Sequence, residues 1–374
     1  MDKKTDVGSK RCKMGNVYDY IRKYGDTLFV DKEFNLIDSV ILSNITYFDF
    51  EGIVPNDGNK ITLNEALKIF LENCDYKDFL NKGFFQKELY KMGKLLIDKN
   101  RYKNILLSDY VYDLSHDKQF CAMKMLLPDG TIYICFEGTD HNVVGWEEDF
   151  ALSYKYPVPA QVDAINYLNR VIKFFDKKVI VGGHSKGGNL ALVSAMNAKF
   201  YIKLKIKAIY NFDGPGLRKR EINSFKFKLI KRKLVHVIPN YSIIGLLLRH
   251  ESNYKVIKSS RMDFMAHCIF TWKVEKDRFE ETELSTLSKR LDSSITLWLE
   301  EHSDEERELV STGLFGILKE LQIDNFMETT KFRNLLAIIK TSKKMDQSTK
   351  NMLVDFVKFN VSYCLMKNES EDKT

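Results

Sequence analysis

A serine between glycines is the residue whose surroundings best suit covalent chemistry. Gly183-His184-Ser185-Lys186-Gly187 fits G-x-S-x-G, the elbow at which a strand turns sharply into a helix with a nucleophile at its apex. A side chain at either flanking position would collide with the strand and the helix, which explains both glycines. The pattern alone is weak. The alternative is a glycine-rich turn that binds a phosphate or nothing, although the stretch lacks the Walker A spacing.

Ser185 needs a general base, because a serine hydroxyl at its free pKa is a poor nucleophile. Where this elbow occurs, the acid and the histidine follow the serine in the chain. That order leaves His236, His250 and His267 as candidates. We expect His267 to be the base because it follows the last predicted strand. The structural alternative is a partly buried histidine packed on Trp272.

The elements around the serine alternate between short apolar strands and helices. We predict helices at 159–176 and 186–199, and strands at 119–127, 131–136, 177–183, 206–212, 233–238 and 254–260. This alternation predicts an α/β fold with a mostly parallel, buried sheet flanked by helices.

Helical periodicity dominates both ends of the chain. The C-terminal part should include helices near 304–321, 330–341 and 347–364. We therefore divide the chain into a disordered leader (1–15), an N-terminal helical segment that packs on the core (16–99), an α/β core (100–275) and a C-terminal helical segment (276–374).

Composition excludes several classes of protein. The net charge of +7 permits weak attraction to anionic surfaces but does not require nucleic acid. The six cysteines are scattered without a CxxC pair, which argues against a zinc site and a disulfide framework. No apolar leader is visible, and the apolar runs are too short to cross a bilayer. We expect a cytoplasmic protein that needs no metal or organic cofactor.

Two further motifs carry a resemblance. CFEGTD…GWEEDF (135–150), followed by VGGHSKGG, resembles the class 3 lipases of the α/β-hydrolase superfamily. In those enzymes a strand ends in Phe-x-Gly-Thr or Phe-x-Gly-Ser, and a Trp and an Asp precede G-H-S-x-G. The chain as a whole resembles a bacterial family of lipase-like α/β hydrolases with helical flanks, through segments 34–54, 212–216, 238–248 and 267–274.

The resemblance leaves the acid in question. In class 3 lipases the acid follows the next-to-last strand, where this chain has Ser242. Asp213, in YNFDGPG, ends the strand after the elbow helix and opens on the same sheet edge as the histidine. We take Asp213 as the first candidate and Asp263 as the second. The structural alternative for Asp213 is a turn residue that caps its own loop.

The resemblance also implies an oxyanion hole. The backbone amide of Lys186 begins the elbow helix and is free to donate to a developing oxyanion. Thr139, in FEGTD, would supply the second donor through its amide and its hydroxyl. Trp146 and Asp149 are expected to order that loop, and the His184 side chain is expected to point away from the site.

Residues 217–233 form a basic segment with interleaved apolar side chains, eight basic residues against one acid. The segment would act as a mobile lid or make a weak contact with an anionic membrane surface. The other interpretation is a solvated helix at the sheet edge.

We predict a serine-dependent ester hydrolase of the lipase or esterase type that acts on a small-molecule or lipid ester through an acyl-enzyme at Ser185. Two alternatives stay open. One is a catalytically inactive scaffold or binding protein, which the missing acid at position 242 would favour, and the other is an acyltransferase. The sequence leaves open the acyl-chain preference, the oligomeric state and the role of the helical flanks.

Overall fold

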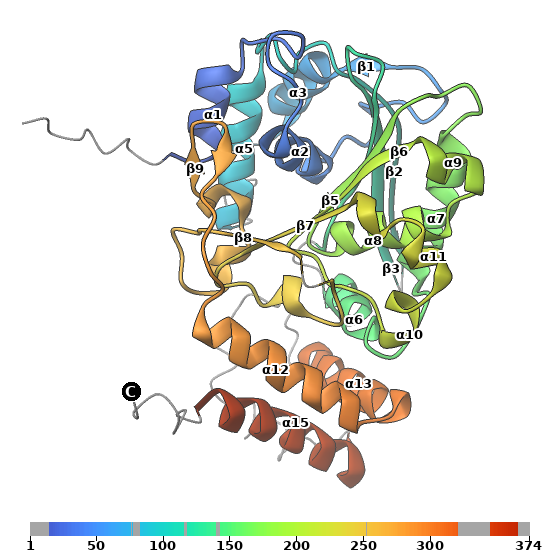
Figure 1. Ribbon diagram of the computed structural model, residues 1–374, viewed down its shortest axis with the longest axis vertical. Helices are drawn as coiled ribbons and strands as arrows, with labels where there is room; N and C mark the ends of the chain where they lie inside the picture. The colour runs from blue at the N-terminus through green and yellow to red at the C-terminus, as the bar shows by residue number, and fades with distance from the viewer. Residues whose placement is uncertain are drawn as a thin grey trace, which may run out of the picture.

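The centre of the molecule is an eight-stranded sheet whose strands lie in chain order (Figure 1). The computed structural model describes residues 15–75, 77, 83–115, 118–139, 143–251, 253–320 and 345–365. Strands β1 to β4 pair antiparallel and β4 to β8 pair parallel. The strands are β1 (Ile61–Thr62), β2 (Leu106–Ser115), β3 (Lys118–Leu126), β4 (Ile132–Phe136), β5 (Val179–His184), β6 (Ile206–Phe212), β7 (Leu234–Pro239) and β8 (Lys255–Ile257).

Side chains that alternate along each strand divide the core between two faces of the sheet. On β3, Met123 and Met125 join one apolar cluster, whereas Phe120 and Ala122 join the other. The first cluster includes the N-terminal helices α1 (Val17–Tyr24), α2 (Leu36–Ser43), α3 (Leu63–Asn73) and α5 (Phe84–Leu96). The second includes α7 (Pro159–Val171), α8 (Lys186–Asn197), α9 (Phe200–Lys205) and α11 (Phe225–Lys228). The predicted fold class is thereby confirmed.

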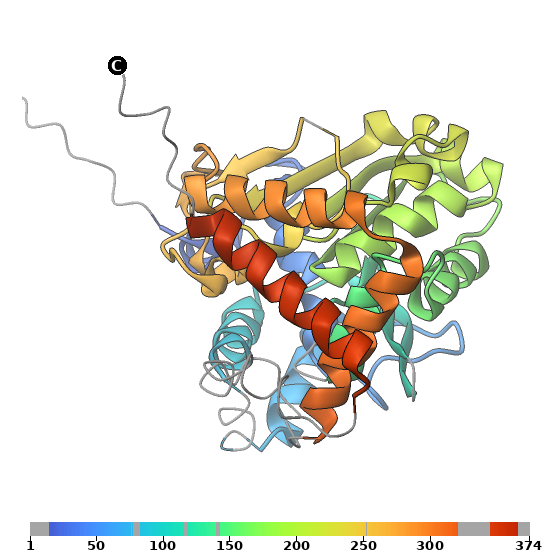
Figure 2. The same ribbon diagram turned by 90° about the horizontal axis from the view of Figure 1, so that it is seen from below.

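The C-terminal helices pack against loops that leave the sheet. They are α12 (Thr286–Glu301), α13 (Asp304–Glu320) and α15 (Gln347–Leu365), and Figure 2 shows α15 lying across the other two. Trp298, Phe315 and Leu353 from these helices form one apolar cluster with Trp146 of α6 (Val143–Ala151) and with Ile244, which follows β7. The C-terminal segment therefore covers the edge at which the parallel strands end.

Some predictions differ from the structure. Strand β2 and helix α6 were not predicted. The apolar alternation of β2 is broken at Asp109, which has a positive φ of 54° and lies within an irregular stretch of its pairing with β3. The leader, apart from residue 15, and the helix expected at 330–341 lie outside the described residues. In the described ranges, none of the helices is long and apolar enough to span a membrane.

A buried ion pair joins the N-terminal segment to the chain that enters the sheet. Arg101 donates to both carboxylate oxygens of Asp38 at 2.8 and 2.6 Å, and neither side chain is exposed to solvent. The hydroxyl of Tyr102 donates to the same carboxylate at 2.7 Å. Arg101 also donates to the backbone carbonyls of Lys32 and Glu33. One guanidinium therefore holds α2 and the loop that precedes it.

We expect Arg101→Met to lower the free energy of unfolding by about 3–5 kcal/mol, because it leaves the Asp38 carboxylate buried without its cation. The matched control is Lys68→Met, which removes an exposed partner of Asp98 and should cost less than about 1 kcal/mol. Urea unfolding followed by fluorescence measures both. Equal losses in the two variants would show that burial does not set the strength of the Asp38–Arg101 pair.

Candidate active site

Ser185 lies at the turn between β5 and α8 in a backbone conformation that L-residues rarely adopt, with φ 57° and ψ −135°. The backbone approaches closely on both sides of it. A Cβ at Gly183 would overlap the backbone of Gly187, and a Cβ at Gly187 would overlap the carbonyl oxygen of Phe136. The predicted need for glycine at both flanking positions is confirmed.

His267 and Asp213 meet at the carboxyl edge of the sheet. Asp213 directly follows β6, and His267 ends a short 3₁₀ helix (Phe264–His267) beyond β8. The Nδ1 atom of His267 lies 2.6 Å from Oδ2 of Asp213, whose side chain is fully buried. The serine elbow begins where β5 ends, so the carboxyl ends of the parallel strands β5, β6 and β8 bring these residues to one edge of the sheet.

Ser242, at the position where the resemblance led us to expect the acid, contacts the carboxylate of Asp213. The hydroxyl of Ser242 donates to Oδ1 of Asp213 at 2.5 Å, and the backbone N–H of Gly245 donates to the same oxygen at 3.1 Å. The residue that stands in place of the expected acid therefore binds the carboxylate of the neighbouring strand. Sequence spacing could not reveal this contact, because 29 residues separate the two side chains.

His184 does not point away from the site as expected. Its ring lies 4.4 Å from the ring of His267, and its Nε2 is 2.9 Å from the backbone carbonyl of His267. Its Nδ1 is 3.2 Å from the hydroxyl of Tyr47, which accepts a hydrogen bond from the N–H of Gly138. Burial, together with the neighbouring His267, holds the pKa of His184 well below its usual range. A neutral His184 with its proton on Nε2 satisfies all of these contacts.

The candidate oxyanion donors lie on either side of the elbow. Lys186 is the first residue of α8, so its N–H has no acceptor within the helix. In the loop after β4 the N–H of Gly138 donates to Tyr47, and the next residue is Thr139, which the resemblance suggests as the second donor. The Thr139 hydroxyl donates to Oδ2 of Asp149 at 2.6 Å. Asp149 therefore fixes the rotamer of Thr139, in agreement with its expected role in ordering this loop.

The side chain of Lys186 has a separate structural role that the sequence did not reveal. It is fully buried, and its Nζ donates to Glu148 at 3.0 Å and to the backbone carbonyl of Gln119 at 2.9 Å. The other oxygen of Glu148 accepts the N–H of Ala160. Lys186 thus anchors α6 at Glu148, the residue that precedes Asp149 in this helix.

The other candidate residues lie in separate environments. Asp263 pairs with Arg261 and caps its own 3₁₀ helix. His236 and His250 pack on each other with ring centroids 5.7 Å apart, and burial lowers their pKa values to about 3 and about 4. Among the described residues, no group of three or more His, Cys, Asp or Glu side chains is arranged to hold a metal ion.

Comparisons with known proteins place the chain in a family. The model of the Mbeg1-like family matches residues 96–316, which is more than half of the chain and includes the elbow, Asp213 and His267. The chain belongs to the Mbeg1-like family. This family is lipase-like, so the resemblance drawn from the motifs is confirmed at the family level. A comparison with curated proteins gave no match.

Two solved structures similar to this chain are lipases. Rhizomucor miehei lipase, in a complex with its propeptide, is 18% identical over 45% of this chain, with a TM-score of 0.33. The chain spans 60% of the length of that lipase. M37 lipase is 14% identical over 56% of this chain and 68% of its own, with a TM-score of 0.32.

We expect Asp149→Asn to stabilise the protein more at pH 8 than at pH 4.5. Burial raises the pKa of the Asp149 carboxyl to about 6, so the folded state holds this proton more tightly than the unfolded state. Wild-type stability therefore falls as the pH rises from about 4 through 6, whereas the uncharged amide avoids this loss. Urea unfolding at both pH values measures the difference between the two proteins. A difference that does not change with pH would mean that Asp149 titrates as an ordinary surface carboxyl does.

Proposed function

We propose that this protein is a serine-dependent carboxylic ester hydrolase that acts through an acyl-enzyme at Ser185. The observation that carries the proposal is the 2.6 Å contact between His267 Nδ1 and Asp213 at the sheet edge where Ser185 turns. A histidine held in this way by a buried carboxylate has one tautomer and one orientation, with Nε2 available as a base. The lipase-like family supports a hydrolase in general terms.

The reaction would follow two half-reactions. Ser185 Oγ attacks the ester carbonyl carbon while His267 Nε2 takes the hydroxyl proton. The backbone amides of Lys186 and Thr139 donate to the oxyanion that forms. His267 then gives its proton to the leaving alcohol oxygen as the C–O bond breaks, which leaves an acyl-enzyme. A water molecule then attacks the acyl carbon while His267 takes one of its protons. His267 returns this proton to Ser185 Oγ as the bond between Oγ and the acyl carbon breaks, which releases the carboxylic acid and free Ser185.

The buried contacts around the site would keep this machinery in place before substrate binds. Asp149 orients Thr139, the Glu148–Lys186 pair anchors the helix that carries Asp149, and Tyr47 holds Gly138. Donors fixed in advance stabilise developing charge without reorganising, and in many acyl-transfer enzymes this stabilisation contributes more to the rate than any other effect.

One observation favours the inactive scaffold as the second candidate. The Ser185 hydroxyl forms no hydrogen bond with the His267 imidazole, although the structure describes both residues. Such contacts often tighten only when substrate binds, so labelling of the serine decides between the two candidates. An acyltransferase would use the same acyl-enzyme, with an alcohol or amine in place of water.

We expect a fluorophosphonate probe to label the wild-type protein and to leave Ser185→Ala unlabelled. Labelling of His267→Ala should be nearly abolished, and Asp213→Asn should label about 10⁴-fold more slowly, because its histidine is held in the wrong tautomer. The readout is the rate of adduct formation by mass spectrometry. Labelling that persists in Ser185→Ala would contradict the assignment of the nucleophile.

The control for labelling is Ser194→Ala. Ser194 lies on the same helix, is fully buried and donates to the backbone carbonyl of Ala191, so its loss should not change the labelling rate. A folded wild-type protein that stays unlabelled with detergent present would overturn the proposed hydrolase and favour the inactive scaffold.

Because Ser242 touches Asp213, the acid should be movable between the two positions. We expect the double variant Asp213→Ser, Ser242→Asp to recover at least about tenfold in labelling rate, or about 1.4 kcal/mol, over Asp213→Ser alone. The single variant Ser242→Asp is the control, because two adjacent carboxylates repel and should not gain activity. If the double variant labels no faster than Asp213→Ser, the carboxylate must come from the strand after the elbow.

A further inference from the structure

An apolar cavity of about 230 Å³ lies between the candidate site and the C-terminal helices. Its wall includes Asp149, which binds Thr139, and Pro215, two residues beyond Asp213. Phe264, whose ring lies 6.0 Å from that of His267, forms another part. Trp298 of α12 and Phe356 of α15 line the far side. The cavity therefore touches the loop that carries Asp213 and the 3₁₀ helix that ends at His267, and Asp149 of α6 connects it to Thr139.

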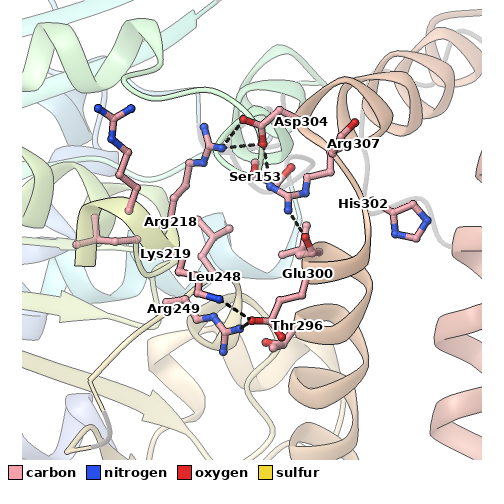
Figure 3. Close-up of a pocket in the computed structure, with 14 residues that line it drawn as sticks. Ser153, Arg218, Lys219, Leu248, Arg249, Thr296, Glu300, His302, Asp304 and Arg307 are labelled. Atoms are coloured by element: carbon pink, nitrogen blue, oxygen red, sulfur yellow. Dashed lines mark hydrogen bonds and ion pairs between the residues drawn. The ribbon is translucent and has the colours of Figure 1, made fainter. Parts of the chain in front are cut away.

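A second pocket adjoins this cavity and has the opposite character. It has a volume of about 590 Å³ and shares Ser153, Leu248, Leu299 and Arg307 with the apolar cavity as lining residues. Its remaining wall comes from the segment around α10 (Lys219–Ile222), the loop between β7 and β8, and the turn between α12 and α13 (Figure 3). The two spaces thus form one apolar and one polar compartment in contact.

The polar compartment carries an excess of positive charge. Five cationic side chains line it against two carboxylates, those of Glu300 and Asp304; the cations are Arg218, Lys219, Arg220, Arg249 and Arg307. Arg218 and Arg307 both donate to Asp304, and Arg249 donates to Glu300, as the dashed lines in Figure 3 mark.

The carboxylates hold the guanidinium groups in place but leave donors unused. Arg249 uses only one of its terminal nitrogens in the pair with Glu300, and its side chain is 37% exposed. Arg220 forms no ion pair with any residue that the structure describes. Arg249 is thus held by Glu300 and keeps free N–H groups, and Arg220 adds a cation without an ion-pair partner in the described part of the chain. A guanidinium fork matches the geometry of a phosphate, which can accept two parallel hydrogen bonds from it.

We propose that the substrate is an acyl ester that also carries a phosphate group, with its acyl chain in the apolar cavity and its phosphate in the basic pocket. This inference rests on the proposed function for the ester chemistry, but the binding site stands on the geometry of the two compartments. It also gives part of the basic segment 217–233 a role: Arg218, Lys219 and Arg220 line the pocket, whereas Phe227 and Ile230 are buried in the core.

Binding is tested first, without catalysis, on full-length Ser185→Ala by calorimetry. Octyl phosphate, octyl glucoside and inorganic phosphate are titrated at low ionic strength, below micelle-forming concentrations. We expect octyl phosphate to bind at least tenfold more tightly than either of the others, because only octyl phosphate fills both compartments. If octyl glucoside binds as tightly as octyl phosphate, the phosphate group is not recognised and the proposed phosphate site is wrong. If inorganic phosphate binds as tightly as octyl phosphate, the pocket binds the free anion and the proposed substrate is wrong.

The basic pocket is then tested by removing charge from it. Arg249→Gln and Arg220→Gln, each in the Ser185→Ala background, should each weaken octyl phosphate binding by about five- to tenfold and leave octyl glucoside binding unchanged. The matched control is Arg232→Gln, which removes an exposed cation of the same segment outside the pocket and should have no effect. Equal losses in all three variants would mean that general charge attracts the ligand, and the proposed site would be wrong.

Catalysis separates failure of this inference from failure of the proposed function. With Ser185 intact, the ratio of kcat/KM for a phosphate-bearing octanoyl ester to that for a neutral octanoyl ester should exceed 10 and fall in Arg249→Gln. Ser185-dependent hydrolysis with a ratio near 1 would keep the hydrolase and overturn the phosphate site. Tight octyl phosphate binding without hydrolysis of either ester would keep the site and overturn the hydrolase.

Discussion

The site depends on one buried carboxylate. Asp213 is fully buried and sits at a positive φ of 51°, a conformation that costs free energy for any residue with a side chain. A charge removed from water must be satisfied by hydrogen bonds, and here the donors come from two other loops. Ser242 and Gly245 follow β7, and His267 follows β8. Because the buried carboxylate of Asp213 needs these donors, it holds the loops after the neighbouring strands β6, β7 and β8 in fixed positions relative to one another.

A second set of buried contacts fixes the other side of the elbow. The buried side chain of Lys186, on α8, pairs with Glu148 of α6, so this ion pair holds the two helices together. Tyr47 connects the N-terminal segment to both His184 and Gly138. Breaking either contact would leave a polar group buried without its partner, which costs more than the contact itself contributes. The helical flank is in this way part of the site, because its tyrosine holds the loop that carries Thr139.

The C-terminal helices change what the sheet edge can bind. Loops at such an edge are usually open to solvent, and ligands bind there because strand ends from several elements meet. In this protein α12, α13 and α15 cover those loops and enclose an apolar space beside the site. The last turn of α12 carries Glu300 and the first residue of α13 is Asp304, and these two carboxylates hold the arginines in place. The C-terminal helices thus both enclose the apolar space and supply the carboxylates that position the cations of the neighbouring loops.

The sequence by itself determined the features that depend on neighbours along the chain. The elbow was predictable because its serine and both flanking glycines lie within five consecutive residues, although the atoms that a Cβ at Gly187 would meet belong to Phe136 and Glu137 beside the elbow. The parallel strands were predictable from continuous apolar runs. Strand β2 was missed because Asp109 interrupts its pattern. The sequence already favoured Asp213 over Asp263, but the contact of Asp213 with His267, the contact from Ser242, the buried Lys186–Glu148 pair and the two adjoining compartments were decided by tertiary structure. In each of these features the residues are far apart in the chain. They come together only because of the order of the strands and the packing of the helical flanks, so the spacing of residues in the sequence could not predict the contacts.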